Sequence, residues 1–464
     1  MSFTENLTAA RHHIIFLCGL TVAFGTVAYL ENVDPYKKPA GIYELETSGV
    51  IPAVEHTELT PLEQKWAQIA WRYFDRNYQT ETGLVNSVDQ YTATTLWDTS
   101  SYLLGMISAY RLGVIEEQDF HTRLGKALES MADLPLFEET LPNKSYNTIS
   151  LAMVDYTNQE SEQGIGWSAL DIGRVLVPLN IVVWNYPQHV DAVKNILQAW
   201  DFEAMLRDGV LYGAEVDEEG NTNYVQEGRI GYEEYAAKSL SLMGYDVSKA
   251  LAYADYLEFE TINGFDIPTD TRIPEIYHAH NYVVSESYIL DGLEFAWDYR
   301  SKEFAYRVYK AQEARYTKTG QLTAVSEDNI DQAPYFVYNT VFTSGKAWNA
   351  ITETGEDASE FRTISTKAAI GWHLLYDTDY TQKLVEKVEG LYDEEKGWYS
   401  GWYEIKNRPN KAITANTNGI ILEALAYKQF GKLVAAYDQE VVVEGFVEAD
   451  VDTPITKTAA AEVD

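Results

Sequence analysis

The segment TGLVNSVDQ, at residues 82–90, places a glycine ahead of an apolar run and a carboxylate six residues after that glycine. The same outline returns in DGVLYGAE at 208–215, in TGQLTAVSED at 319–328 and in KGWYSGWYE at 396–404. Each copy follows a helix-like segment and leads into another that is rich in small and aromatic residues. Because recurring units are typical of repeat architectures, the pattern predicts copies of one helix–loop–helix unit whose carboxylates gather on one face.

Helical periodicity extends over residues 61–437 with little strand signal. Charged, amphipathic segments lie at 62–78, 119–133, 188–206, 247–260, 301–318 and 361–392. Segments that are poor in charge lie between them, at 94–112, 167–184, 229–244, 284–299, 335–350 and 415–430. A helix that is apolar nearly all round is buried, whereas one with a charged face lies outside. Six outer and six inner helices in alternation predict an all-α fold, an (α/α)6 toroid of six helical hairpins, with a superhelical stack of hairpins as the alternative. The segment 361–392 is expected to break near Asp377.

Both ends of the chain are predicted to lie outside this domain. Residues 14–30 form an uncharged, mostly apolar run that follows Arg11. The pattern is typical of a signal peptide or signal anchor over 1–30, which either engages the membrane or is cleaved. We therefore expect a periplasmic or extracellular protein, which residues 14–30 anchor to the inner membrane if they are retained. Prolines and polar residues mark 31–60 as a tether, and the acidic end at 438–464 is expected to be a disordered tail.

The formal net charge of −36, from 35 basic and 71 acidic residues, limits the partners. Nucleic-acid binding needs basic stripes that neutralise phosphates, so we expect no nucleic-acid partner. Neutral or zwitterionic ligands fit this charge better than polyanions. The single cysteine, Cys18, lies in the N-terminal apolar run, which excludes a disulfide within the chain and a cysteine-based metal site.

If every inner helix begins on the same face, the residues at the helix starts converge there. Acids favour the first turn of a helix as caps, which is the plain interpretation of each one. Capping does not explain why tryptophans and tyrosines accompany the acids, whereas a sugar site needs both. We therefore expect an oligo- or polysaccharide partner. The candidate substrate-binding residues are Trp97, Trp167, Asp171, Arg229, Tyr232, Tyr335, Trp398, Trp402, Glu404 and Asn418.

Inverting hydrolysis of a glycosidic bond needs a protonated acid and a base for water, with carboxyl groups roughly 6.5–9.5 Å apart. Glu227 ends a long polar loop and is the candidate acid, because the glycine after it lets backbone approach a ligand. Asp98 opens the first inner helix and is the candidate base, while Glu286 and Asp328 are rival catalytic candidates. The repeated acids, Asp89, Glu215, Glu327 and Glu404, are interpreted as architectural or sugar-binding.

Two weaker patterns concern metals. Residues 215–226 resemble the start of an EF-hand loop, but Glu215 and Gln226 stand where Asp and Glu belong, which disfavours calcium. His278 and His280 are more typical of ordinary loop residues than of ligands. The chain also has no P-loop, no GxGxxG ahead of a helix and no GxSxG. We expect no metal and no cofactor.

Four motifs carry a resemblance to a known family: GLVNSVDQYTATTLWDTSSYLLGMISAYRLGVI at 83–115, QEGRIGYEEYAAKSL at 226–240, TAVSEDNIDQAPYFVYN at 323–339 and NKAITANTNGIILEALAYK at 410–428. Together they resemble a bacterial envelope domain of unknown function, of the DUF3131 type. That domain in turn looks like a distant relative of the (α/α)6 enzymes that act on β-1,2-glucans, including glucoamylase-like domains. The resemblance implies a toroid fold and a glucan-active site, while the catalytic pair of those enzymes does not transfer to named residues of this chain.

These observations predict a glycoside hydrolase-like envelope protein that hydrolyses a neutral glucan of the β-1,2 type by inversion. One alternative is a non-catalytic glycan-binding or envelope assembly protein on the same scaffold. Another is a structural partner of an envelope complex, which predicts a large apolar surface patch.

Overall fold

The computed structural model describes residues 46–277 and 280–436. The predicted signal or anchor segment at 1–30 and the predicted tail at 438–464 lie outside these ranges. Within them, no helix has the length and apolar character needed to cross a membrane. The helices are α2 (Pro61–Asn77), α3 (Leu96–Arg111), α4 (Glu117–Asp133), α5 (Ala169–Asn185), α6 (Val190–Ala199), α7 (Tyr232–Leu242), α8 (Pro274–Tyr277), α9 (Glu286–Phe295), α10 (Tyr299–Thr319), α11 (Thr366–Tyr376), α12 (Asp379–Val388) and α13 (Ala415–Phe430).

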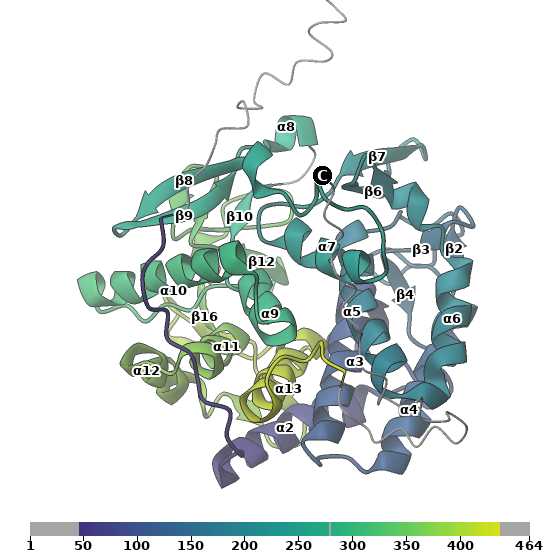
Figure 1. The fold of residues 1–464 in the computed structure, drawn as a ribbon, viewed down its shortest axis with the longest axis horizontal. Helices are drawn as coiled ribbons and strands as arrows, with labels where there is room; N and C mark the ends of the chain where they lie inside the picture. Colours follow the sequence, from purple (N-terminus) through teal and green to yellow (C-terminus); the bar gives the residue numbers. More distant parts are fainter. Residues whose placement is uncertain (1–45, 278–279, 437–464) are drawn as a thin grey trace, which may run out of the picture.

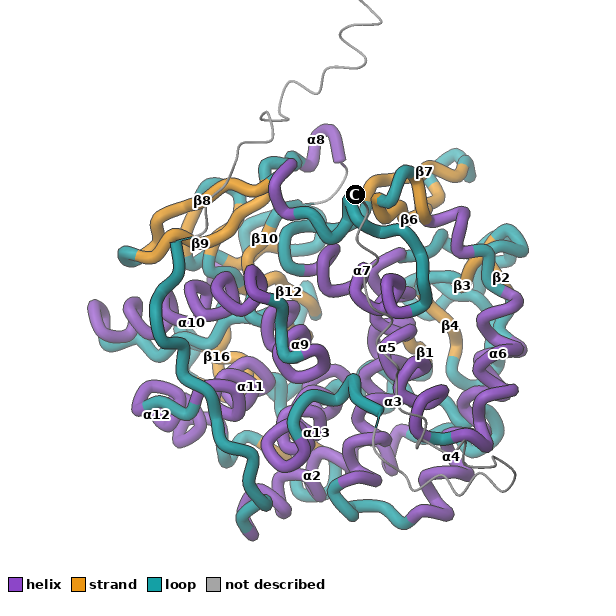
Figure 2. The backbone as a smooth tube through the Cα atoms, in the orientation of Figure 1, coloured by secondary structure: helices purple, strands orange, loops and turns teal. Residues whose placement is uncertain are grey.

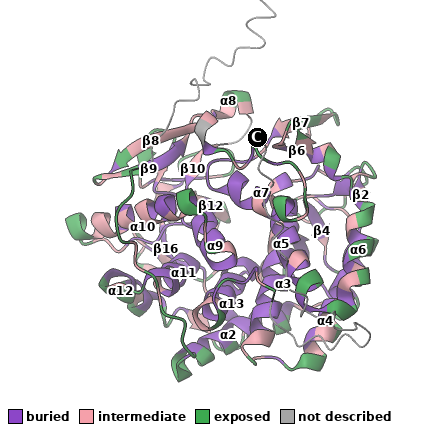
Figure 3. Ribbon diagram, viewed as in Figure 1, coloured by how far each residue is buried: buried purple, intermediate pink, exposed green. Residues whose placement is uncertain are grey.

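Six of these helices form a closed inner ring (Figure 1). Around the ring, α3 packs on α5, α5 on α7, α7 on α9, α9 on α11, α11 on α13, and α13 returns to α3. The return contact closes the ring, so the fold is a toroid and not an open superhelical stack. Side chains of the inner helices are buried nearly all round, as their low charge predicts, and the outer helices keep an exposed face (Figure 3).

The outer helices pack against this ring and carry strong end signals. Helix α2 lies on α13 and α3, α4 on α3, α6 on α5, α10 on α9, and α12 on α11. Thr60 and Glu63 form a capping box at the start of α2, with Pro61 in the first turn. Asp377 adopts a left-handed conformation between α11 and α12, which confirms the break predicted in the segment 361–392.

Short antiparallel strands occupy the loops around the starts of the inner helices (Figure 2). Strands β1, β7, β10, β16 and β20 each end a few residues before an inner helix begins. The strands are β1 (Ala93–Thr95), β2 (Leu136–Phe137), β3 (Leu141–Pro142), β4 (Ser145–Asn147), β5 (Leu206–Arg207), β6 (Val210–Val216), β7 (Thr222–Gln226), β8 (Leu257–Ile262), β9 (Phe265–Asp270), β10 (Tyr282–Val283), β11 (Glu327–Asn329), β12 (Phe336–Asn339), β13 (Phe342–Thr343), β14 (Lys346–Ala347), β15 (Ala350–Ile351), β16 (Thr363–Ser365), β17 (Tyr392–Asp393), β18 (Gly397–Trp398), β19 (Gly401–Tyr403) and β20 (Arg408–Asn410).

Two of the predicted helices are wrong. The predicted outer helix at 247–260 is replaced by the antiparallel hairpin β8–β9, which packs on α10 in the place of an outer helix. The predicted inner helix at 335–350 is a run of strands, β12 to β15, and the inner position belongs to α11. In the described chain the toroid therefore has six inner helices, five outer helices and one outer β-hairpin.

Residues 46–60 run along the outside of the domain before α2 begins (Figure 1). The backbone amide of Ser48 donates to the carboxylate of Glu303 on α10 at 3.0 Å, and the amide of Thr57 donates to the carbonyl of Lys428 on α13 at 3.0 Å. This segment thus connects two sides of the domain.

Candidate functional site

The first two turns of the inner helices meet on the axis of the ring. Each inner helix contributes one side chain to a connected group, which we call the axial cluster: Trp97, Arg174, Tyr232, Glu286, Lys367 and Asn416. The capping residues explain this placement, because Thr95 starts α3, Ser168 starts α5 and Thr414 starts α13 at matching heights.

Glu286 is the centre of the axial cluster. Its carboxylate accepts hydrogen bonds from Trp97 Nε1 at 2.9 Å and from Asn416 Nδ2 at 2.7 Å, and it forms an ion pair with Lys367. Arg174 lies 3.7 Å away and stacks over the Trp97 ring. Burial acts to raise the pKa of Glu286, but the charges of Lys367 and Arg174 outweigh it and hold that pKa below its usual value. Glu286 is therefore an anion that orients its neighbours.

Asp328 supports the same lysine from β11. Its carboxylate accepts hydrogen bonds from Thr363 Oγ1 at 3.1 Å and Ser365 Oγ at 3.0 Å, and lies 3.9 Å from Lys367 Nζ. Burial raises its pKa to about 7. Because Glu286 and Asp328 are each only 1% exposed, both lie beneath the surface that a substrate reaches.

Asp98 and Asp171 are half-buried and lie in the first turns of α3 and α5. The hydroxyl of Thr95 donates to Asp98 at 3.0 Å, and the hydroxyl of Ser168 donates to Asp171 at 3.0 Å. Burial and then the charge of Glu227 raise the pKa of Asp171 to about 7. Burial also raises the pKa of Asp98, and its hydroxyl partners oppose that rise. Both acids combine a capping role with partial access to solvent.

Glu227 follows β7 and reaches the start of α5. Its carboxylate accepts hydrogen bonds from the backbone amide of Ala169 and from that of Leu170 at 3.4 Å. It lies against Gly213, where an added Cβ would meet the carboxyl group at 2.9 Å. Burial raises its pKa while the two amides oppose the rise. Glu227 therefore caps a helix from a neighbouring loop.

Glu327 is a half-buried acid beside the axial cluster that the sequence assigns only to the repeat. It lies on β11 next to the hydroxyl of Tyr232. Burial first and then the negative charge of Glu286 raise its pKa to about 8, so the carboxyl group is protonated at neutral pH. Its raised pKa and partial exposure make it a functional candidate. The sequence signal for Glu327 is its position in the repeated Gly-to-acid pattern, in the copy at 319–328.

A line of aromatic rings leads outward from the axial cluster. The Trp97 ring lies 5.8 Å from that of Tyr232, which lies 5.8 Å from that of Tyr282. Tyr282 stacks on Tyr338 with ring centroids 4.0 Å apart. Sequence analysis proposed Trp97 and Tyr232 as sugar contacts but neither Tyr282 nor Tyr338, which come from strands β10 and β12.

Three predicted sugar contacts lie in the core instead. Trp398 is fully buried and donates from Nε1 to the carbonyl of Trp66 at 3.2 Å. Asn418 is also fully buried and accepts a hydrogen bond from the Trp398 amide at 2.8 Å. Trp167 is 1% exposed and donates to the carbonyl of Tyr212 at 3.1 Å. Each of these three side chains is buried and forms a hydrogen bond with a backbone group, so none of them faces a ligand.

Two more predicted contacts lie away from the axis. Glu404 is bound by Arg315 at 2.8 Å and by Arg362 at 3.2 Å, which makes it architectural. Trp402 lies beneath Lys387, whose Nζ is 3.4 Å from the ring centroid.

Tyr335 and Arg229 complete the placement of the predicted residues. Tyr335 is exposed on the loop between β11 and β12. Arg229 is buried ahead of α7 and lines a side pocket next to Tyr282. Across 46–277 and 280–436, no group of three or more His, Cys, Asp or Glu side chains has the arrangement of a metal site.

The closed ring of inner helices with its outer layer defines an (α/α)6 toroid. A candidate glucoamylase from Bacteroides caccae has a similar structure, with a TM-score of 0.56 at 10% identity over 80% of this chain and 94% of that chain. An endo-β-1,2-glucanase from Chitinophaga pinensis, in complex with sophorotriose and glucose, gives 0.55 at 12% identity over 80% and 93%. One from Talaromyces funiculosus, with sophorose, gives 0.53 at 10% over 81% and 85%.

The chain belongs to the family described as protein of unknown function (DUF3131), whose profile matches residues 65–431. A search of curated proteins finds no significant match. At these low identities the similarity to the solved enzymes establishes the fold, and activity has to be argued from the site.

Proposed function

We propose that this protein hydrolyses a neutral glucan of the β-1,2 type by an inverting mechanism, with Glu327 as the acid and Asp98 as the base. One observation carries the proposal: Glu327, which is held protonated with a pKa of about 8, and Asp98 are both half-buried acids beside the axial cluster. The charges of Arg174 and Lys367 act on both groups. An acid that keeps its proton at neutral pH is what a glycosidic leaving group requires.

The reaction follows from these two roles. Glu327 gives its proton to the glycosidic oxygen as the bond to the anomeric carbon breaks. Asp98 takes a proton from the water whose oxygen forms the new bond to that carbon, on the opposite face. One product carries a hydroxyl group at the former glycosidic oxygen, and the other carries the new reducing end. Glu327 then takes up a proton from solvent and Asp98 releases one, which restores their starting states.

This assignment moves the acid role from Glu227, the sequence candidate, to Glu327. Two backbone amides of α5 donate to Glu227, and such donors favour the ionised form of a carboxyl group. Within 46–277 and 280–436 no backbone amide is found donating to the Glu327 carboxyl group, and Glu286 nearby disfavours its ionised form. Glu227 then serves as a rigid wall of the site, and it remains a second choice for the base.

The glucan class is supported by the similar structures and by charge. The structures of similar fold include endo-β-1,2-glucanases with sophorose or sophorotriose bound. The aromatic line from Trp97 to Tyr338 supplies ring faces for sugars, and the half-buried acids disfavour an anionic polymer. We place the activity in the cell envelope, outside the cytoplasm, with residues 14–30 as signal or anchor. Fractionation of cells that express the full chain tests that location.

A glycan-binding protein is the second candidate. The observation that favours it is that Asp98 and Asp171 both make helix-capping contacts, which need no catalysis. A binding protein keeps its affinity for the glycan and produces no new reducing ends.

The deciding experiment compares Glu327→Gln and Asp98→Asn with the native chain on β-1,2-glucan and on a panel of other neutral glucans. Glu386→Gln, at an exposed acid on the outer helix α12, is the matched control. We expect each site variant to lose activity about 100-fold or more, the control to keep it, and proton NMR to detect the inverted anomer first. Full activity in both site variants overturns the assignment. Binding without turnover of any glucan establishes the second candidate.

A further inference from the structure

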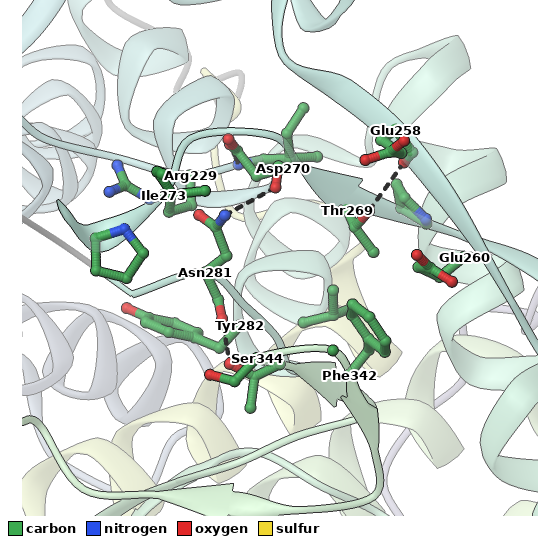
Figure 4. Close-up of a pocket in the computed structure, with 16 residues that line it drawn as sticks. Arg229, Glu258, Glu260, Thr269, Asp270, Ile273, Asn281, Tyr282, Phe342 and Ser344 are labelled. Carbon is green, nitrogen blue, oxygen red and sulfur yellow. Dashed lines mark hydrogen bonds between the residues drawn. The ribbon is translucent and has the colours of Figure 1, made fainter. Parts of the chain in front are cut away.

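A side pocket of about 280 Å³ opens beside the axial cluster (Figure 4). Its walls come from β8 and β9, from β10, from the β13–β14 turn and from the residues just before α7. Figure 4 shows Glu260 and Phe342 on one side and Asn281 and Tyr282 on the other. The hairpin β8–β9 that forms one wall is the element that replaces an outer helix. Segments that connect the regular elements of a fold often carry its binding residues, and this hairpin lies between the inner helices α7 and α9.

Tyr282 connects this pocket to the axial cluster. One of its neighbours is Tyr232 of the cluster, at a ring distance of 5.8 Å, and Tyr282 also lines the pocket. A ligand in the pocket and a ligand at the axial site would therefore share this tyrosine as a common wall.

Acidic side chains outnumber basic ones in the lining of the side pocket. Arg272 balances the charge of Asp270, which lines the pocket, and of Glu233 behind it, through ion pairs at 2.5 Å with each. Glu260 lines the pocket and has no ion-pair partner among residues 46–277 and 280–436. Glu258 lies two residues earlier on the same strand and lines the pocket as well. Three carboxyl groups, those of Glu258, Glu260 and Asp270, line the pocket against one guanidinium, that of Arg229, so the lining favours a neutral ligand over an anionic one.

The remaining lining residues suit a ring with hydroxyl groups. Asn281 donates from Nδ2 to the carbonyl of Asp270 at 2.8 Å, which holds its side chain in the pocket wall, and its buried Oδ1 has no hydrogen-bond partner among the described residues. Phe342 and Pro268 supply apolar surface for the C–H face of a sugar. The volume lies just below the range of about 300–1,000 Å³ that is typical of pockets for larger ligands, so one ring fits and an oligosaccharide does not.

We propose that this side pocket is a second carbohydrate site that holds one neutral pyranose ring, with Glu260 accepting from its hydroxyls and Phe342 against its face. The inference rests on the proposed function in taking this ring to be a further unit of the same glucan. The pocket takes no part in bond cleavage. It anchors the polymer beside the axial site.

Saturation-transfer NMR with monosaccharides tests the pocket independently of turnover. The probes are glucose, mannose and galactose, with glucuronate as the anionic comparison. We expect weak binding, with Kd of about 1 mM or above, for at least one neutral sugar and none for glucuronate. Glu260→Gln and Phe342→Ala are expected to weaken that binding by about tenfold. Glu386→Gln, an exposed acid on α12, is the matched control and is expected to change nothing.

The variant Glu327→Gln separates the two sites. Sugar binding that survives Glu327→Gln and falls in Glu260→Gln belongs to the side pocket. The inference is overturned if no neutral sugar binds, if glucuronate binds as well as glucose, or if both pocket variants bind as the native chain does. Each of these results leaves hydrolysis at the axial site standing, whereas loss of the proposed function shows only in the turnover assay.

Discussion

Lys367 of α11 and Glu286 of α9 form an ion pair on the ring axis, where Lys367 is 5% exposed and Glu286 is 1% exposed. Lys367 Nζ also donates to Asn416 Oδ1 of α13 at 2.6 Å. One lysine therefore connects three of the inner helices. A buried charge of this kind is costly to leave without its partner, so the pair fixes how these helices meet as well as the charge at the site.

Replacing this lysine is expected to destabilise the domain strongly. Lys367→Met removes the cation and leaves the Glu286 carboxylate with Arg174, at 3.7 Å, as its one positive neighbour in the part of the chain that the structure describes. Breaking a buried pair in this way costs about 3–5 kcal/mol in the free energy of unfolding, which urea denaturation measures. Lys318→Met, at an exposed lysine on α10, is the control and is expected to change stability by less than about 0.5 kcal/mol. Equal losses in the two variants would contradict a central role for the pair.

The pH dependence of turnover is expected to be bell-shaped. Activity falls as the pH rises through about 8, because Glu327, whose pKa is raised to about 8, then loses the proton it must donate. Activity also falls at low pH, because Asp98, whose pKa burial raises, then takes up a proton and no longer acts as the base. Profiles of kcat/KM measure both limbs. A profile without an alkaline limb near pH 8 would contradict the assignment of Glu327 as the acid.

The start of α5 offers a test of the Glu227 contact. In Gly213→Ala the new Cβ would lie 2.9 Å from the Glu227 carboxyl group, which must then move off the amides of Ala169 and Leu170. We expect a loss of about 1–3 kcal/mol in stability and a lower kcat, measured by denaturation and by the glucan assay. Gly390→Ala is the matched control, because an added Cβ meets nothing within 4 Å there. A fall in stability of similar size in the control would argue against the contact.

The sequence predicts the ring well because apolar periodicity and capping residues act locally. Its two errors have local signals too. Asn263 and Gly264, both with positive φ, form the two-residue turn of β8–β9, and Asn-Gly is a strong hairpin signal. Ser344 and Gly345 form the same kind of turn between β13 and β14. In the segment 335–350 most residues belong to strands, whereas in 247–260 only the last four residues lie in a strand, β8, and turns and a short 3-10 helix precede them.

The axial site is only partly predictable, because side-chain direction depends on strand register. Glu327 pairs with Tyr338 and Asp328 pairs with Val337, so consecutive acids point to opposite faces of β11. Glu327 reaches the cluster and Asp328 reaches the hydroxyls of β16. A shift by one residue would exchange these roles, and the sequence pattern does not specify that shift.

A pair of buried acids on two inner helices, Glu294 of α9 and Glu423 of α13, predicts how stability depends on pH. Glu294 and Glu423 are both fully buried, and the hydroxyl of Tyr235 donates to Glu294 at 2.7 Å. Burial and then the charge of Glu423 raise the pKa of Glu294, and burial raises that of Glu423 to about 7. Both groups therefore bind protons in the fold that the unfolded chain has already released above pH of about 4.3.

Since the folded state binds more protons, the free energy of unfolding is expected to fall as the pH rises from about 5 through about 7. Glu294→Gln removes one of these protons from the balance, while its amide oxygen still accepts from Tyr235. We expect the slope of unfolding free energy against pH to become shallower by up to about 1.4 kcal/mol per pH unit. Urea denaturation at pH values between 5 and 8 measures the slope, with the exposed Glu386→Gln as control. If Glu294→Gln and the native chain lose stability in parallel across that range, the protonated pair is not what makes the fold sensitive to pH.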